Sequence, residues 1–126
     1  LVASSINNLT KLEKAICDCQ KCPRLVKWTR KVAKEKRKSY ENETYWGKPV
    51  PGFGDLKPKL LVVGLAPGAH GANRTGRIFT GDRSGDWLYR AMHKQGFANK
   101  PESINKKDGL KLINARVLTA VRCAPP

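Results

Sequence analysis

The stretch KLLVVGLAPGAHGANRTGRIFTGD, residues 59–82, decides how this chain folds. It begins with an apolar run, residues 60–63, which ends on Gly64 and has the pattern of a buried strand. A long polar segment punctuated by glycine follows at once. Open α/β sheets bind their ligands outside the carboxyl ends of their strands. The stretch therefore predicts a strand at residues 60–64 and a ligand-binding loop at residues 64–82.

Two helices are predicted before this strand. Apolar residues recur at helical spacing over residues 5–20, at Ile6, Leu9, Leu12 and Ile16. Pro23 suits the first turn of a second helix, which we expect to continue over residues 24–38 with an apolar side formed by Leu25, Trp28 and Val32. The opposite face of this helix is strongly basic. Its Lys and Arg residues include Arg30, Lys31, Lys34, Lys36, Arg37 and Lys38.

One more helix and one more strand are predicted after the loop. The helix covers residues 85–95, with Ser84 as its N-cap and Gly96 as its stop, and the strand lies within residues 112–122. Helix, strand, helix and strand in this order indicate an α/β layer structure with parallel strands. Two strands are few for such a sheet, and the chain stops on Pro-Pro directly after a strand. We therefore expect residues 1–126 to be a fragment of a longer protein.

The charge of the chain favours a polyanionic partner. Its 126 residues include 25 Lys and Arg against 10 Asp and Glu, a formal net charge of +15. Nucleic acid is the first candidate, and an anionic membrane surface or a generally basic surface are the alternatives. No apolar run approaches the ~20 residues of a membrane span, and no signal-peptide pattern opens the chain. We expect a cytoplasmic protein that does not bind membranes.

Four cysteines stand in this chain, and in the cytoplasm they are more often metal ligands or free thiols than disulfides. Cys19 and Cys22 have the C-x-x-C spacing that holds one metal centre. Cys123 follows the last predicted strand and could fold back onto them. Iron–sulfur clusters take four thiolates, whereas zinc ribbons need a second pair of cysteines. Cys17, two residues from Cys19, is expected to be a spare.

The loop at residues 64–82 does not fit a nucleotide triphosphate. GANRTGRI has the spacing of a P-loop, but Arg77 stands where that motif has Lys and Ile78 where it has Ser or Thr. What remains is a set of exposed main-chain N–H groups, one aromatic ring at Phe79 and one carboxylate at Asp82. Such a set suits a pocket for a flipped-out base.

Each of these side chains also has an ordinary structural explanation. Phe79 could be a core aromatic, and Asp82 could cap the next helix or close an Asx-turn. His70 could hydrogen-bond within its loop. His93, in the middle of a predicted helix, is expected to be a surface residue.

GLAPGAHGANRTGRIFTGD, residues 64–82, closely resembles the first motif of the iron–sulfur uracil-DNA glycosylases, in the thermophile branch called family 5 or type B. CPRLVKW at residues 22–28, YWGKPVPGFGD at 45–55 and VRCAPP at 121–126 look like the same proteins in the same order. The resemblance covers roughly residues 10–126.

The resemblance implies a three-layer α/β/α sandwich with a central parallel sheet, incomplete in this chain. It implies a DNA repair glycosylase, a monomer at the nucleoid, that hydrolyses the N-glycosidic bond of uracil flipped out of double- or single-stranded DNA. Cys19, Cys22 and Cys123 match three ligands of a [4Fe-4S] cluster, whose fourth cysteine lies beyond Pro126 in the family.

The resemblance also implies roles for single residues of the pocket. The substrate-binding residues it marks are Gly64, Leu65, Ala66, Pro67, Gly68, His70, Phe79 and Thr119. The main chain of the first three would hold the uracil edge, Phe79 would stack on the base, and Asp82 would assist the chemistry. Thr119 stands where a sister branch reads uracil with Asn, which implies a looser pocket that accepts other deaminated bases.

Leu65 stands where several related families have an acidic residue or Asn that positions the attacking water. The competing hypothesis is a non-catalytic, basic DNA-binding module with an iron–sulfur or zinc centre, or an inactive fragment.

Overall fold

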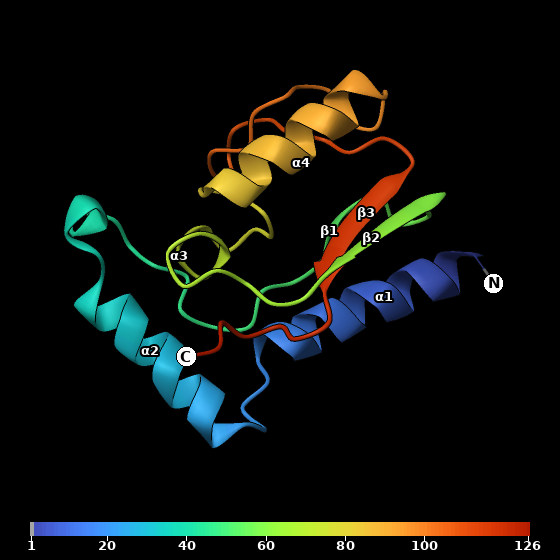
Figure 1. Cartoon of the computed structure of the whole chain (residues 1–126). Helices are drawn as coiled ribbons and strands as arrows, with labels where there is room; N and C mark the ends of the chain where they lie inside the picture. Colours follow the sequence, from blue (N-terminus) through green and yellow to red (C-terminus); the bar gives the residue numbers. More distant parts are fainter. Residues whose placement is uncertain (1) are drawn as a thin grey trace.

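A computed structural model of the chain describes residues 2–126, with side chains from residue 7 onward. The side chain of Ile6 therefore lies outside the described part. Residues 2–126 form a mixed α/β structure with four helices, one 3-10 turn and three strands (Figure 1). In chain order these are α1 (Val2–Cys17), α2 (Pro23–Glu35), η1 (Lys38–Tyr40), β1 (Phe53–Gly54), β2 (Leu60–Gly64), α3 (Ala72–Thr75), α4 (Arg83–Lys94) and β3 (Ala115–Thr119).

The three strands form one sheet in the order β1-β3-β2. β2 and β3 are parallel, with Leu60 opposite Ala115 and Gly64 opposite Thr119, which confirms the predicted parallel pair. β1 is antiparallel to β3, and no strand was predicted at its position. Gly54 allows this pairing at φ +123°, because a Cβ there would lie 2.5 Å from the carbonyl oxygen of Ala115.

The prediction that β2 is buried was wrong for the described residues. The side chains of Leu61 and Val63 are 52 % and 56 % exposed. The reason is position: within residues 2–126, β2 is an edge strand whose one neighbour is β3. β3, in the middle of the sheet, is the strand that is buried, with Ala115 and Val117 fully inaccessible.

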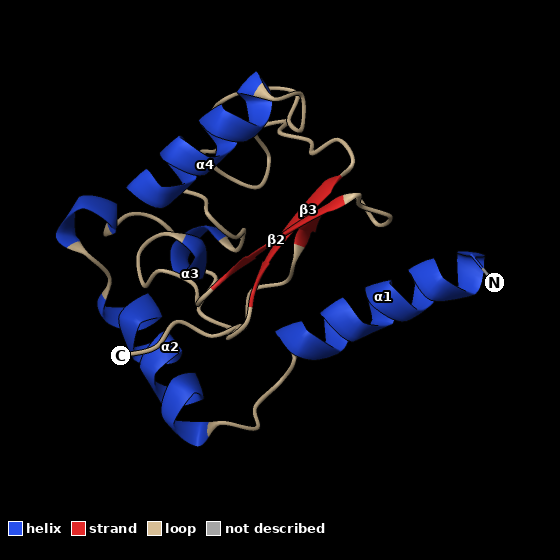
Figure 2. Cartoon of the chain, turned by 45° about the vertical axis from the view of Figure 1, so that its right-hand side comes forward, coloured by secondary structure: helices blue, strands red, loops and turns tan. Residues whose placement is uncertain are grey.

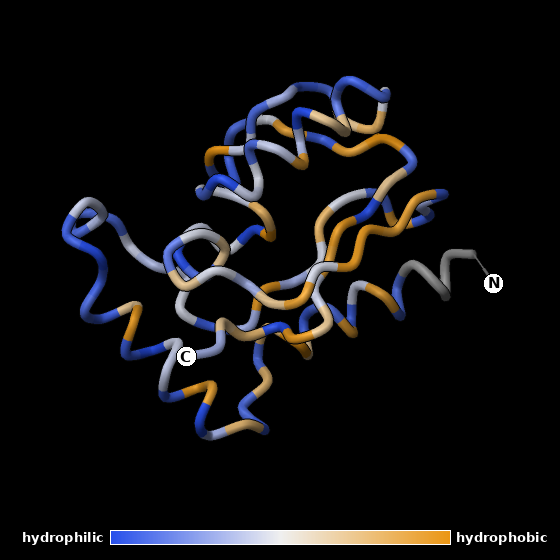
Figure 3. The backbone as a smooth tube through the Cα atoms, in the orientation of Figure 1, coloured by the Kyte–Doolittle hydropathy of each residue, from blue (hydrophilic) through white to orange (hydrophobic). Residues whose placement is uncertain are grey.

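The sheet lies between two helices, α4 on one side and α1 on the other (Figures 1 and 2). The apolar core lies between α4 and β3, where Tyr89 and Met92 of the helix pack with Val117 of the strand. Figure 3 shows the hydrophobic colouring concentrated along the strands. In the part of the chain that the structure describes, no helix has both the length and the apolar composition needed to cross a membrane.

The helix boundaries differ from the predicted ones by a few residues. Pro23 occupies the first turn of α2, as predicted, but the helix ends at Glu35 because Lys36 has a left-handed backbone, φ 58°. The N-cap of α4 is Asp82, not Ser84: its side chain accepts a hydrogen bond from the N–H of Gly85. Asp and Ser are comparable caps, so local preference alone did not separate them.

Helix α1 is fastened to the sheet by the carboxylate of Glu13, which is 12 % exposed. It accepts hydrogen bonds from the Gly52 N–H (2.7 Å) and from Arg122 Nη1 (3.3 Å). Arg116 Nη2 of β3 lies 3.5 Å from the other oxygen. Arg116 is itself buried, so the carboxylate neutralises a cation that water does not reach.

We expect Glu13→Gln to lower the free energy of unfolding by about 2–4 kcal/mol, because it leaves the Arg116 guanidinium buried without a counter-charge. Glu35→Gln is the matched control, since its partner Lys31 is exposed and the pair is worth under about 0.5 kcal/mol. Urea unfolding of both variants measures the difference. Equal losses would show that the Glu13 carboxylate does not anchor α1.

Candidate active site

The structure brings together three of the predicted base-pocket residues at the carboxyl ends of β2 and β3. A Cβ added to Gly64 would lie 2.6 Å from Cζ of Phe79 and 3.3 Å from Cγ2 of Thr119. The Phe79 ring therefore lies directly over Gly64, and only glycine leaves room for it. Phe79 holds a left-handed backbone, φ 50°, an uncommon conformation for an aromatic residue that marks a constrained position.

Thr119 turns its methyl carbon, Cγ2, towards Gly64 and carries its hydroxyl beside it. Its side chain is 1 % exposed, and its hydroxyl has no hydrogen-bond partner among the described residues. A buried, unpaired hydroxyl costs about 1–3 kcal/mol, so a group that pairs with it gains that energy. Leu65 contributes main chain alone, since its side chain is 82 % exposed. Its carbonyl accepts from the N–H of Val121, which continues the β2–β3 contact beyond the strands.

Asp82 lies in a second cluster, where the glycines of the loop make room for it. One carboxylate oxygen accepts hydrogen bonds from the Gly85 N–H and the Ser84 hydroxyl. The other faces the loop: a Cβ on Gly71 would lie 2.1 Å from it, and one on Gly68 would lie 2.9 Å from it. The helix-capping alternative is thus confirmed, and one oxygen remains directed at the loop.

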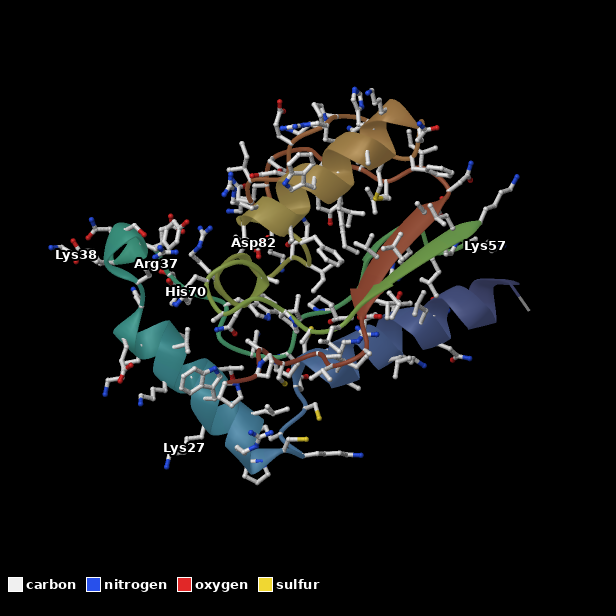
Figure 4. All side chains as sticks on the ribbon, in the orientation of Figure 1. Lys27, Arg37, Lys38, Lys57, His70 and Asp82 are labelled. Carbon is white, nitrogen blue, oxygen red and sulfur yellow. The ribbon has the colours of Figure 1, made fainter. Side chains whose placement is uncertain are left out.

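His70 lies in the same cluster. Its Nδ1 is 2.9 Å from the hydroxyl of Tyr45, a residue that we did not single out from the sequence. Burial, with the charges of Arg37 and Arg74, lowers the pKa of His70. Figure 4 shows Arg37, His70 and Asp82 at one end of the molecule, between α2 and α4.

These side chains share one cavity of about 310 Å³. It is lined by Arg37, Tyr40, Gly68, Ala69, His70, Gly71, Gly81, Asp82 and Arg83. Asp82 is the one carboxylate among these residues, opposed by two arginines. The cavity can therefore accept a polar or anionic ligand and present a carboxylate to it.

Arg74 closes the loop on itself. Its guanidinium donates to the carbonyls of His70 (2.6 Å) and Gly81 (2.8 Å), two positions that flank the loop's short helix α3. It also pairs with Glu43 at 2.6 Å and stacks on the ring of Tyr40. An arginine inside a glycine-rich segment was the one sequence signal of this role.

Arg77 ties the loop to the segment that follows α4. Its guanidinium pairs with both oxygens of Asp108, at 3.0 and 2.7 Å, and donates to Ser103 and Thr80. Burial alone would raise the pKa of Asp108. Hydrogen bonds from Arg77 and from the N–H groups of Ile104 and Leu110 instead hold it well below its usual range.

The predicted metal ligands come from both ends of the chain. Burial raises the pKa of the Cys123 thiol, and the charges of Cys19 and Cys22 raise it further. The C-terminus lies beside α2 in two views (Figures 1 and 2). Within residues 7–126 no three His, Cys, Asp or Glu side chains surround a single point that could hold one ion.

Cys17 has different surroundings. Burial raises its pKa, and the charged groups that act on it are Lys48, Glu13, Lys106 and Asp18, not the other thiols. It lines, together with Cys19, a cavity of about 370 Å³ between α1, α2 and residues 47–49.

A basic face runs along α2 towards the cavity. Arg30, Lys31, Lys34 and Lys38 are exposed, and Arg37 is both exposed and part of the cavity wall. In Figure 4, Lys27 and Lys38 mark the two ends of this face, whereas Lys57 lies at the far end of the sheet. One basic stretch thus leads along α2 to the cavity.

A family model and several individual proteins match this chain, and both kinds of match indicate the same family. The family model of the uracil DNA glycosylase superfamily matches residues 51–125. The chain is 51 % identical to a protein from Mycobacterium tuberculosis named type-5 uracil-DNA glycosylase, over 99 % of this chain and 47 % of the relative. It is also 51 % identical to the protein of the same name from Mycobacterium leprae, over 100 % of this chain and 55 % of the relative. The protein of the same name from Thermus thermophilus is 54 % identical, over 86 % of this chain and 48 % of the relative. The chain spans about half the length of the curated relatives it matches.

We expect Asp108→Asn to destabilise the chain at neutral pH by about 3–5 kcal/mol, because Arg77 remains buried and unpaired. The folded-state pKa of Asp108 is depressed, so its contribution is present above the unfolded pKa near 3.8 and is lost as pH falls below that value. The difference in unfolding free energy between wild type and variant should therefore become smaller in acid. Thermal unfolding between pH 7 and pH 3 measures it; a gap independent of pH would contradict the ionised pair.

Proposed function

The chain belongs to the uracil DNA glycosylase superfamily, and we propose that it carries the base pocket of an enzyme that hydrolyses the N-glycosidic bond of uracil in DNA. The observation that carries this proposal is the convergence of Gly64, Phe79 and Thr119 at the ends of the parallel strands. A flat ring, a close main chain and an unpaired hydroxyl suit a planar base with polar edges.

In the proposed mechanism, Phe79 stacks on the flipped uracil while main-chain N–H groups at residues 64–66 hold its polar edge. Uracil leaves as an anion, the sugar gains oxocarbenium character, and water attacks its anomeric carbon. Leu65 has no base to offer, so catalysis rests on N–H donors that stabilise the departing anion. The free oxygen of Asp82 orients the water or balances the positive charge on the sugar. Thr119 stands where the sister branch has Asn, and its hydroxyl offers the base fewer hydrogen bonds than an amide does. A pocket of this kind accepts other deaminated bases besides uracil.

The proposed substrate is uracil-containing DNA, double- or single-stranded. The basic face of α2 contacts phosphates without regard to sequence, and such binding weakens steeply with salt. Flipping costs a few kcal/mol and is cheapest at a mismatch, which favours deaminated sites. We further propose that the protein acts as a monomer at the nucleoid.

We also propose that Cys19, Cys22 and Cys123 supply three of the four thiolates of a [4Fe-4S] cluster. The support is the C-x-x-C spacing of Cys19 and Cys22 and their effect on the pKa of Cys123, about a hundred residues away in the sequence. The thiolates of a cluster bind different iron atoms, so they need not surround one point, as the ligands of a zinc ion must. When bound, the cluster supplies a covalent link between the α1–α2 connection and the end of β3; no chemical step passes through it.

The architecture fits one part of a three-layer α/β/α sandwich. α1 and α4 lie on opposite sides of the sheet, as two outer layers require (Figure 2). We propose that residues 1–126 form the N-terminal part of one such domain. The exposed side chains of Leu61 and Val63 on β2 mark a place where further residues of such a domain would pack.

Asp82→Asn tests the catalytic carboxylate without removing the helix cap, because Asn caps as well as Asp. We expect single-turnover uracil release to fall about a hundredfold, within the range of general acid–base contributions, at an unchanged melting temperature. Ser84→Ala is the control, since it removes a hydrogen-bond partner of Asp82 but keeps the carboxylate. An unchanged rate in the Asn variant would rule out a chemical role for Asp82.

The assay uses the 126-residue chain and a chimera in which the chain replaces the matching segment of the Mycobacterium tuberculosis relative. A duplex with one G·U pair, treated with alkali, reports uracil release as strand scission. We expect release by the chimera. Salt-sensitive DNA binding with no release by either protein would favour the non-catalytic module.

Anaerobic reconstitution with iron and sulfide tests the cluster. We expect a brown protein with visible iron–sulfur absorbance that is lost in Cys19→Ser, Cys22→Ser and Cys123→Ser and kept in Cys17→Ser. Metal analysis of the protein as purified provides the second measurement. Zinc in place of iron, or equal loss of colour in Cys17→Ser, would overturn this ligand set.

A further inference from the structure

Tyr45, which is buried, and His70, which is half-buried, form a pair at the cavity wall. Tyr45 is 7 % exposed, and its ring meets the imidazole edge to face, with 5.8 Å between the centroids. Its hydroxyl contacts two groups: the backbone N–H of Arg37, at 3.2 Å, and His70 Nδ1, at 2.9 Å. Tyr45 is not one of the residues that line the cavity, whereas His70 is. The Nδ1 edge of the imidazole therefore faces away from the cavity.

The positions of the protons follow from these two contacts. The Arg37 N–H can only donate, so it uses a lone pair of the Tyr45 oxygen. The single hydroxyl proton then has one acceptor within reach among the described residues, the Nδ1 of His70. A nitrogen that accepts carries no proton, so the proton of a neutral imidazole lies on Nε2.

The charges around His70 favour this neutral form. Arg37 and Arg74 both act on the ring as cations, and with burial they lower its pKa. Of the nearby carboxylates, Glu43 is paired with Arg74, and Asp82 lies across the cavity, engaged with the first turn of α4. These surroundings disfavour a charge on the ring.

We propose that Tyr45 is a positioning residue that fixes His70 in its neutral, Nε2-protonated form, so that His70 offers the Asp82 cavity a hydrogen-bond donor and not a base. The ligand that receives this bond is an oxygen acceptor of DNA, a phosphate or a base carbonyl. The role of His70 as a donor to DNA rests on the proposed function, whereas the assignment of its tautomer does not. A general base would need a lone pair directed at the cavity, and here the lone pair is taken by Tyr45.

The second histidine of the chain provides an internal reference. His93 Nδ1 lies 3.0 Å from the carbonyl oxygen of Ala98, and a carbonyl can only accept. His93 is therefore protonated on Nδ1 when neutral. The structure assigns opposite tautomers to the two histidines, so that one spectrum contains both patterns.

A long-range proton–nitrogen NMR spectrum of the ¹⁵N-histidine-labelled chain at pH 8 tests the tautomers directly. His93→Gln identifies which pattern belongs to His70. We expect the unprotonated, downfield nitrogen of His70 to be Nδ1. An Nδ1-protonated ring or an even mixture in the wild type would overturn the proposal, without any need for enzyme activity or for a variant of Tyr45 that folds.

Three variants test the roles of Tyr45 and His70. Tyr45→Phe should convert the His70 pattern to a mixture and lower single-turnover uracil release by about tenfold, the size of one hydrogen bond. An unchanged pattern would show that Tyr45 does not set the tautomer. His70→Gln places an amide donor near the Nε2 position and His70→Asn near Nδ1, so Gln should retain more release than Asn. Equal release would refute the donor role, and no release even by the wild-type chimera would instead refute the proposed function.

Discussion

The guanidinium of Arg74 is the constraint on which the loop at residues 64–82 depends. It joins the carbonyls of His70 and Gly81, which lie on either side of the short helix α3. With these points held together, Gly71 lies against the carboxylate of Asp82, and the cavity has a fixed wall. Glu43 and the ring of Tyr40 surround the buried charge, which would otherwise be costly to desolvate.

The Arg77–Asp108 pair is buried on both sides, whereas in the Arg74–Glu43 pair only the guanidinium is buried. Arg74 and Arg77 lie three residues apart, and each fastens the loop to a different part of the chain, residue 43 and residue 108. A glycine-rich loop is flexible in isolation, since glycine restricts the backbone little. The two arginines convert it into a rigid support, which is what donors aimed at a developing charge require. The apolar core between α4 and β3 supplies the scaffold beneath them.

Sequence reasoning located the strand at residues 60–64, its parallel partner and the start of α2 at Pro23, because these depend on apolar patterning and on local backbone preference. It could not find β1, whose two residues are defined by pairing with β3 some sixty positions later. It placed β2 in the interior because an apolar run does not reveal which strand lies at an edge. The same reasoning treated the run from Asn73 to Arg77 as a failed phosphate motif. The partners of its arginines, Glu43 and Asp108, lie about thirty residues away in opposite directions, so nothing local indicated them.

Asp82 shows why a structural and a chemical role need not compete. Its first oxygen fastens the start of α4, and its second faces Gly68 and Gly71 at the cavity wall. A side chain held by the helix cannot rotate away from the loop, so the cap itself fixes the direction of the free oxygen. His70 is held in the same manner, with one nitrogen tied to Tyr45 and the other left to the cavity. In both residues one polar atom is used to orient the other. A cavity built in this way presents a carboxylate and an N–H donor in fixed positions before any ligand arrives, and this preorganisation lowers the cost of binding and of catalysis alike.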